Sequence, residues 1–479
     1  MNQNKNNNII SAEIEIPKQT EFYKIPARFG SVPVDEAPLG CEVETEPRKT
    51  KITKFEHTYP KIILPFQEVR RIEFGHSNKF PATELFPKGA NRLFFGDNLH
   101  IVRQLPSKSI DLIYIDPPFF SGRNYNVIFG DKNEVRSFSD IWEGGMPGYL
   151  IWLNARLYEM KRLLKKTGSI YVHLDWHASH YVKVEMDKIF GVDNFQNEII
   201  WTFTGGTDRG KGFQRKHNTI LFYTKTEKYT FNPIYDPFAE ATIKRFNKVD
   251  ENGRQYKENT LADGRVTKTY MKEEGKLAPD YVHINILVKS HSECIGYPTQ
   301  KPEALLERII KASSNESDVV SDFFCGGGTT LAVAQKLNRR WIGSDQSRIA
   351  VAITADRICR VVEGLENKSS ESGESEKRKQ VQQALLPVPD FTVEHWGIYE
   401  IPRLEKLSTD EFREFVVRAF GGKPENVSPN IHGSRAGVPL YVGESSRRTK
   451  ITKNDVVKFS QAIFKDRKTN FGTMLAWNF

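Results

Sequence analysis

An aspartate, two prolines and a phenylalanine at 116–119 directly follow the apolar run Ile110 to Ile115. The β-branched residues of this run predict a buried strand that the prolines end, so Asp116 lies at the strand's carboxyl end. Prolines donate no N–H, and the turn therefore presents the Asp116 carboxylate and the Pro117 carbonyl as acceptors for an NH2 group. Phe119 adds a flat face on which a heterocycle can stack. We predict a catalytic site for chemistry on a planar amine, made of Asp116, Pro117, Pro118 and Phe119; a plain acidic turn is the alternative.

A second strand end with a glycine-rich turn occurs at 318–330, D-V-V-S-D-F-F-C-G-G-G-T-T, and a helix is expected from 331 to 337. Glycines let the backbone approach a ligand closely, and the helix start supplies unpaired N–H groups. No Lys-Ser or Lys-Thr follows the glycines, and Asp345 ends another short strand at the distance where a carboxylate reaches ribose hydroxyls. The pattern predicts a site for an adenosine compound without phosphates, with a purely structural turn and acid as the alternative. The residues predicted to bind it are Asp322, Phe324, Gly326, Gly328, Thr329 and Asp345.

Together these motifs resemble the S-adenosylmethionine-dependent amino-methyltransferases of DNA. The D-P-P-F motif precedes the F-x-G-x-G motif, which is the order of the circularly permuted β class, and Asp116 in place of a serine indicates adenine N6 as the target. The resemblance covers about Asn91 to Leu365. The segments Y-V-H-L-D at 171–175 and Y-P-T-Q-K-P at 297–302 are similar to those of modification subunits of type III restriction systems and their stand-alone relatives. Phe323 stands where this family usually has proline.

The resemblance implies S-adenosylmethionine as cofactor, double-stranded DNA as partner, and no metal. It places Asp97 beside the adenine of the cofactor, although an ordinary helix N-cap is the alternative for this residue. Thr299 and Lys301 are expected at the methionine end of the cofactor. A restriction subunit and a second copy of the chain stay open as partners. Cytosine-N4 methylation, RNA methylation, and a binding subunit whose activity requires a restriction partner are the alternative functions.

Alternating strands and helices must position these residues. Strands are expected at 92–95, 169–174, 198–203 and 218–223, and helices at 99–105, 149–164, 179–190 and 303–313. This alternation specifies a doubly wound α/β sheet. With the family resemblance, it predicts a Rossmann-like methyltransferase sheet that is circularly permuted and has one antiparallel strand.

Two loops are predicted to contact DNA. The long polar segment from 121 to 148, which contains Arg123 and Tyr125, is expected to form a flap over the target base. The loop from 204 to 216 carries Arg209, Lys211, Arg215 and Lys216 between flexible glycines, which suits a segment that follows a nucleic-acid backbone. A solvated basic loop is the alternative.

The chain divides by composition into six parts. We expect an N-terminal arm at 1–88, a catalytic half at 89–228, a target-recognition region at 229–290, a cofactor-binding half at 291–366, a linker at 367–390 and a C-terminal domain at 391–479. The last part is faintly similar to Mrr-like nuclease folds of the PD-(D/E)-x-K type. Because Val442-Gly443-Glu444 stands where the carboxylate and lysine of such a site are expected, we predict no cleavage and a DNA-contact or assembly role.

The composition favours some classes of protein and argues against others. The 479 residues include 38% apolar ones and carry a formal charge of +9, which favours a polyanionic partner. The four cysteines form no C-x-x-C pair and none adjoins a proline, which argues against a zinc site and against the thiol chemistry of cytosine-C5 methylation. No apolar stretch reaches about 18 residues and the first residues are polar, so we expect a cytoplasmic protein without a membrane span.

Overall fold

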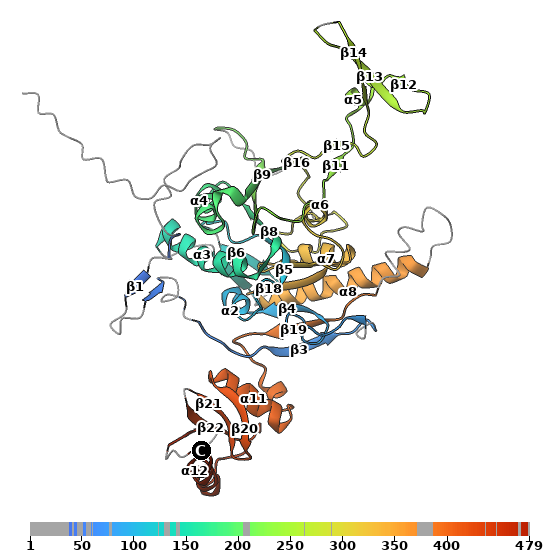
Figure 1. Ribbon diagram of the computed structural model, residues 1–479. Helices are drawn as coiled ribbons and strands as arrows, with labels where there is room; N and C mark the ends of the chain where they lie inside the picture. Colours follow the sequence, from blue (N-terminus) through green and yellow to red (C-terminus); the bar gives the residue numbers. More distant parts are fainter. Residues whose placement is uncertain are drawn as a thin grey trace, which may run out of the picture.

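The computed structural model describes most of the chain from residue 38 onward. The described residues are 38–40, 43–45, 51–53, 59, 61–75, 79–122, 124–128, 135–139, 144–204, 211–262, 264–288, 290–370, 387–435, 437–446, 448–467 and 471–477. Figure 1 shows a central sheet with helices on both faces, an arm at the top and a separate C-terminal unit at the bottom. Within the described residues, no helix is long and apolar enough to cross a membrane.

A ten-stranded sheet in the order β16-β9-β10-β8-β5-β17-β18-β4-β19-β3 forms the centre. β10 runs antiparallel to both of its neighbours, β8 and β9, and β3 at the far edge runs antiparallel to β19. The sheet therefore has two antiparallel strands, whereas the resemblance implies one. The parallel strands need crossover helices, which explains the alternation seen in the sequence. The strands are β3 (Gln67–Ile72), β4 (Asn91–Phe95), β5 (Ile110–Ile115), β8 (Leu164–Leu174), β9 (Phe195–Thr202), β10 (His217–Thr224), β16 (Tyr281–His283), β17 (Val319–Asp322), β18 (Arg340–Asp345) and β19 (Phe391–His395).

Two hydrophobic cores lie on the two faces of this sheet. In β5, Ile113 and Ile115 enter the core shared with α3 and α4, whereas Leu112 and Tyr114 enter the core shared with α6, α7 and α8. This alternation follows from the two-residue period of a strand. Asp116 continues the parity of Leu112 and Tyr114, which directs it toward α6 and α7. The helices are α2 (Asn98–Val102), α3 (Gly145–Leu163), α4 (Ser179–Phe190), α6 (Glu303–Ser313), α7 (Thr329–Lys336) and α8 (Arg348–Ser370).

The sheet also includes strands from outside the predicted methyltransferase segment. β19 pairs in parallel with β4, and β3 pairs with β19 on its other side. Arg92 of β4 makes a buried two-bond pair with Glu394 of β19, at 2.8 and 2.6 Å, which fixes this pairing. The C-terminal unit therefore begins after His395 rather than at residue 391, and the segment predicted as an N-terminal arm supplies an edge strand. α8 extends to Ser370, past the expected start of the linker at 367.

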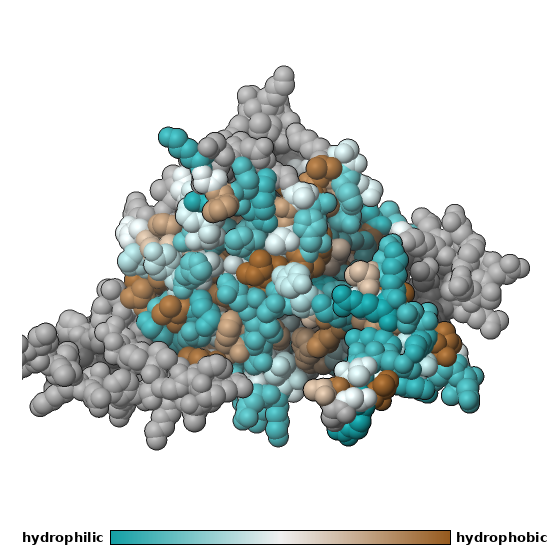
Figure 2. All heavy atoms as spheres, turned by 90° about the horizontal axis from the view of Figure 1, so that it is seen from above, coloured by the Kyte–Doolittle hydropathy of each residue, from teal (hydrophilic) through white to brown (hydrophobic). Residues whose placement is uncertain are grey.

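An arm projects from the sheet on the side of its edge strand β16 (Figure 1). It contains a two-stranded stalk of β11 (Tyr235–Asp236) and β15 (Lys276–Leu277). Beyond the stalk lie the short helix α5 (Glu240–Ile243) and a three-stranded sheet of β12 (Lys248–Val249), β13 (Gln255–Thr260) and β14 (Val266–Tyr270). Arg308 of α6 donates two hydrogen bonds to Asp236, at 2.7 and 3.0 Å, and so ties the stalk to the cofactor-binding half. Figure 2 shows mostly hydrophilic side chains on the face seen from above, with hydrophobic ones in small groups between them.

Two β-hairpins and the C-terminal unit complete the described chain. The hairpins pair β1 (Val43–Thr45) with β2 (Lys51–Thr53) and β6 (Asn124–Ile128) with β7 (Val135–Ser139). The C-terminal unit has its own small cores and a four-stranded sheet in the order β20-β21-β22-β23, in which β22 and β23 are parallel. Its elements are α10 (Ile401–Leu404), α11 (Thr409–Ala419), β20 (Lys423–Ser428), β21 (Ile431–Arg435), β22 (Val438–Val442), α12 (Lys453–Arg467) and β23 (Thr473–Leu475).

Candidate active site

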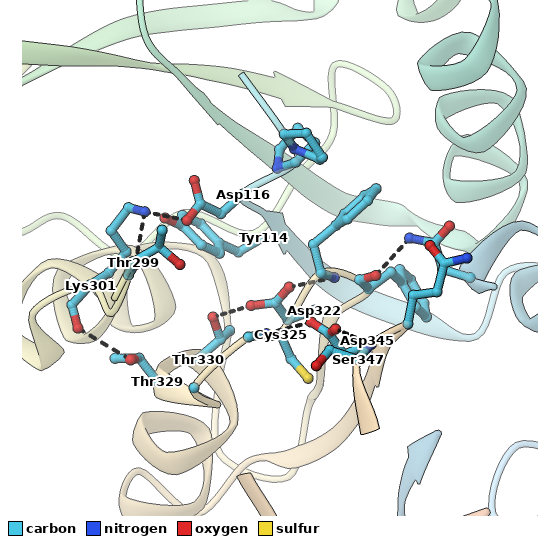
Figure 3. A pocket seen from close by; sticks show the side chains of 18 of the residues that line it. Tyr114, Asp116, Thr299, Lys301, Asp322, Cys325, Thr329, Thr330, Asp345 and Ser347 are labelled. Carbon is cyan, nitrogen blue, oxygen red and sulfur yellow. Dashed lines mark hydrogen bonds and ion pairs between the residues drawn. The ribbon is translucent and has the colours of Figure 1, made fainter. Parts of the chain in front are cut away.

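The two motifs from distant parts of the sequence meet at one edge of the sheet. β17 lies between β5 and β18, with Ser321 opposite Ile113 and Asp322 opposite Gly343, so all three strands end side by side. A cavity of about 490 Å³ opens at these ends and is lined by residues 116–119 from one turn and residues 322–327 from the other. This volume lies within the roughly 300–1,000 Å³ typical of small-molecule sites. In Figure 3, Asp322 and Thr330 lie between Asp116 at one end and Asp345 at the other.

Asp116 is a largely buried carboxylate, with one oxygen in an ion pair and the other without a hydrogen-bond partner among the described residues. Its Oδ2 pairs with the Lys301 ammonium, whereas its Oδ1 is buried and has no hydrogen-bond partner among the described residues. A buried acceptor without a partner costs free energy, which a ligand donor would recover. Burial raises the pKa of Asp116, and the charge and hydrogen bond of Lys301 oppose that rise. Lys301 therefore favours the ionised carboxylate, and Oδ1 is an acceptor that an NH2 donor could satisfy.

A hydrogen bond from α3 holds the Asp-Pro-Pro-Phe turn in place. The Tyr149 hydroxyl donates to the Pro118 carbonyl at 2.7 Å, and Phe120 has a φ of +61°, an unfavourable value for a bulky residue. Strain of this kind persists where surrounding structure enforces it, often at functional sites. Phe119 lines the cavity, with its ring centre 5.8 Å from that of His173 and 5.6 Å from the Lys301 nitrogen. The turn thus presents an acceptor and an aromatic face in fixed positions.

Glycines allow the second turn to close around the cavity. At Gly326 a Cβ would lie 3.0 Å from the Tyr297 ring, and at Gly328 it would lie 2.6 Å from Thr354. Both glycines also have positive φ, 49° and 72°, which other residues rarely adopt. The Asp345 carboxylate accepts hydrogen bonds from the backbone N–H groups of Gly326 at 2.9 Å and Ser347 at 2.7 Å. Asp345 is thereby fixed at the cavity wall, with further lone pairs for the hydroxyl groups of a ribose.

Asp322 lies at the centre of the cavity wall. Its Oδ1 accepts from the Phe324 N–H at 3.0 Å and its Oδ2 from the Thr330 hydroxyl at 2.5 Å. Burial outweighs these bonds and raises the pKa of Asp322 to about 7. The charge state of this group therefore changes near neutral pH, so the cavity is more attractive to a cation above pH 7 than below it.

Most of the predicted cofactor residues line this one cavity, and two do not. Those in the lining are Thr299, Lys301, Asp322, Phe324, Gly326, Thr329 and Asp345. Gly328 lies behind it as the residue preceding α7. Asp97 takes the alternative role, because its Oδ1 caps α2 by accepting from the Leu99 N–H at 2.9 Å and pairs with Arg156 at the same distance. The neighbouring residue Asn98 is in the lining instead.

Lys301 makes a contact that the sequence did not indicate. It lines the cavity, and its ammonium pairs with the Asp116 carboxylate, as Figure 3 shows. Its backbone carbonyl accepts from the Thr329 hydroxyl at 3.2 Å, so the helix that follows the glycine turn holds the lysine in place. Arg357 in turn donates to Thr329 at 2.8 Å. Lys301 thus links the cofactor half of the site to the catalytic turn.

The residues predicted to contact DNA are only partly described. Arg123 and Arg209 lie outside the described residues, and Tyr125 is part of the β6–β7 hairpin. Lys211, Arg215 and Lys216 lie on the loop that leads into β10, where Arg215 is exposed.

Several residues of the lining were missed by sequence reasoning. Tyr114 lies two residues before Asp116 on the same strand face, so the two-residue period could have indicated it. Trp152 and Arg156 come from α3, where the Arg156 guanidinium stacks 3.9 Å from the Trp152 ring centre. Their spacing in the sequence is that of an ordinary helix and carried no signal of a site.

The strand order and the cavity at the strand ends define a Rossmann-like α/β domain of the methyltransferase type. A family model described as DNA methylase matches residues 110–356, more than half of the 479 residues. The chain therefore belongs to this family of DNA methylases.

Curated relatives carry related names. The chain is 26% identical over 389 residues to the type II methyltransferase M.EcaI of Enterobacter cloacae, a match that covers 68% of this chain and 82% of that protein. It is 30% identical over 260 residues to the DNA adenine methyltransferase YhdJ of Escherichia coli K12, covering 54% of this chain and 79% of that protein. Among solved structures, the cytosine-N4-specific PvuII DNA methyltransferase aligns with a TM-score of 0.39 at 17% identity, over 66% of this chain and 95% of that one.

Proposed function

We propose that this chain transfers a methyl group from S-adenosylmethionine to the N6 amine of an adenine that is turned out of double-stranded DNA. The observation that carries the proposal is the buried Asp116 Oδ1, an acceptor without a partner among the described residues, beside the Phe119 ring. An exocyclic NH2 group is the kind of donor that this atom lacks, and a purine is the kind of flat ring that Phe119 can stack on. The naming of YhdJ as an adenine methyltransferase agrees with this choice of base.

Asp116 and its neighbours position the amine. The base leaves its stack at a cost of a few kcal/mol, and stacking on an aromatic ring offsets this by about 1–3 kcal/mol. Asp116 Oδ1 and the Pro117 carbonyl accept the two N6 hydrogens, which localises the nitrogen lone pair and directs it away from the turn. When the new N–C bond has formed, N6 must lose one proton, and Asp116 Oδ1 is the acceptor nearest to it. Because burial raises the pKa of Asp116, this carboxylate takes a proton more readily than an exposed one does.

The glycine turn and its neighbours fit the cofactor. We assign the ribose hydroxyls to Asp345 and the cationic part of the cofactor to the wall at Asp322, since these carboxylates line the same cavity. When bound, S-adenosylmethionine supplies an electrophilic methyl group on a sulfonium. Positioning then accounts for most of the rate gain, because well-placed reactants save roughly 7–11 kcal/mol of the barrier. Lys301 is a positioning residue that holds Asp116 ionised and correctly oriented.

The restriction system in which the chain works and its target-recognition region are also part of the proposal. The relatives M.EcaI and M.BglII are named type II methyltransferases, which supports site-specific methylation linked to a restriction system. The likeness to type III modification subunits at 171–175 and 297–302 extends this to a chain that works with a restriction subunit, or alone as the stand-alone relatives do. We place target recognition in the segment from 229 to 290, because the arm that it contains projects from the sheet beyond the edge strand β16.

Nucleoside analysis tests the proposal. Purified chain is incubated with unmethylated DNA and S-adenosylmethionine, the DNA is digested, and the nucleosides are separated by mass spectrometry. We expect N6-methyladenosine in its deoxy form. N4-methylcytosine would identify the alternative base, methylation of RNA alone would identify another substrate, and no product from the isolated chain would support the binding-subunit alternative. Long-read modification detection on DNA from expressing cells then maps the recognition sequence.

A further inference from the structure

A column of side chains in mutual contact follows the end of β8, and two of them, Trp176 and Arg215, are exposed. The register of β10 on β8 pairs Thr219 with Leu174, so residues just beyond β8 face residues just before β10. There, the Arg215 guanidinium carbon lies 3.5 Å from the centre of the Trp176 ring. Neither residue belongs to the cavity lining.

The column has four layers, which we name the Trp176 column. The His177 ring centre lies 3.7 Å from that of Trp176, and the His177 Nδ1 lies 2.8 Å from the Asp175 carboxylate. His177 and Arg215 would collide if both lay this close to one face of Trp176, so they occupy its two faces. The order is therefore Asp175, His177, Trp176 and Arg215. Arg215 is the outermost layer and is exposed.

The column lies close to the catalytic turn. β5 and β8 are parallel neighbours with Ile115 opposite Val172, so Asp116 and Asp175 both leave the sheet at the same edge. The charge of Asp175 contributes to the raised pKa of Asp116, which also shows that the two carboxylates are near one another. The column therefore follows a strand end that neighbours the catalytic turn.

The chemistry of the column fits a phosphate. Contact with the Trp176 ring restricts the Arg215 guanidinium, and the exposure of Arg215 leaves its N–H groups accessible to a ligand. No carboxylate pairs with Arg215 within the part of the chain that the structure describes. Residues 211–217, K-G-F-Q-R-K-H, contain three cations and no acid, and Phe213 is fully exposed. A fixed guanidinium in a basic segment matches the backbone of a nucleic acid better than an apolar or basic partner.

We propose that the Trp176 column is a phosphate clamp for DNA, in which Arg215 donates to a phosphate beside the target base on the strand that carries it. The clamp rests on the proposed function, since DNA must be the substrate. By holding the backbone at the mouth of the cavity, it helps to keep the strand in the shape that an extruded base requires. Trp176 acts by fixing the guanidinium, and Asp175 and His177 support Trp176 from below.

Salt-dependent binding tests the clamp. Binding of a fluorescently labelled duplex is titrated at several salt concentrations for wild type, Arg215→Gln, Trp176→Ala and Arg360→Gln. Arg360 is the control, because it is an exposed arginine of α8 that does not line the cavity. We expect Arg215→Gln to bind about tenfold more weakly and to lower the slope of log K against log salt by about one. Trp176→Ala should weaken binding with the slope retained, since the charge is still present, and Arg360→Gln should match wild type.

Unchanged affinity and slope in Arg215→Gln would overturn the clamp, provided that wild type binds and methylates DNA. If wild type neither binds nor methylates DNA, the proposed function itself fails, so the two failures are distinguishable. Calorimetry with S-adenosylmethionine shows whether each variant keeps its folded cavity. Once the recognition sequence is mapped, single neutral methylphosphonates are placed around the target. The one beside the target base should weaken wild type but not Arg215→Gln, and an effect found only at distant phosphates would contradict the location of the clamp.

Discussion

Replacing Lys301 with methionine removes the cation that faces the buried Asp116 carboxylate and keeps most of the side-chain volume. The side chains of Lys301 and Asp116 are only 12% and 16% exposed, so water replaces little of the lost interaction. Removing one partner of a buried pair costs about 3–5 kcal/mol, and residual exposure favours the lower end. A cost of about 3 kcal/mol corresponds to a decrease of roughly 100-fold in the ionisation constant of Asp116.

The pKa of Asp116 determines the direction in which the methyl-transfer rate of Lys301→Met should change with pH. Burial raises the pKa of Asp116 and Lys301 lowers it, so the variant must have a higher pKa than wild type at this group. Its methyl-transfer rate should be below wild type by up to about 100-fold at the acidic end of the profile and should recover as the pH increases. Lys301→Arg keeps the charge and should retain more activity than Lys301→Met.

Single-turnover methylation between pH 6 and 10, with S-adenosylmethionine affinity measured in parallel, checks this. Lys336→Met is the matched control, because it removes a lysine from a pair with Glu303 outside the cavity lining. A Lys301→Met rate and pH profile equal to wild type would refute the positioning role. Loss of cofactor affinity at every pH, with no recovery at high pH, would instead favour the position at the methionine end that the sequence predicts.

Three further outcomes are expected. Asp345→Ala should weaken S-adenosylmethionine binding about 30-fold by calorimetry, since hydrogen bonds to a charged group are lost, and unchanged affinity would remove Asp345 from the ribose site. Because the pKa of Asp322 is raised to about 7, its carboxylate is ionised above pH 7 and protonated below; cofactor affinity should fall about tenfold from pH 8 to 6, and Asp322→Asn should flatten that dependence. With magnesium present, the purified protein should leave supercoiled plasmid uncut, because Val442-Gly443-Glu444 lacks the lysine of a nuclease site; nicking would contradict this.

Strand ends were the part of the site that the sequence could predict. Asp116 and Asp345 each follow a short apolar run, and in a parallel sheet such ends gather at one edge. Glycines at 326 and 328 were recognisable because a close backbone approach restricts side chains there. The alternation of helices and strands predicted the doubly wound sheet, because parallel strands need helices to connect them.

The sequence could not predict contacts between distant segments. Lys301 and Asp116 are 185 residues apart, and no periodicity links them, so the sequence did not indicate that they pair. Asp97 has a strand-end position like that of Asp116, yet Arg156 from α3 engages it, and a local pattern cannot show this. The pairing of β19 with β4 also joins segments some 300 residues apart, which explains why the C-terminal boundary was expected too early.

The central claim is that Asp116 Oδ1 receives the amine of the target base, and the most direct measurement compares wild type with Asp116→Ala. Methyl transfer to DNA and equilibrium binding of S-adenosylmethionine are measured on the same preparations. The account predicts transfer below detection in the variant with cofactor affinity close to that of wild type. Measurable turnover by Asp116→Ala would contradict it.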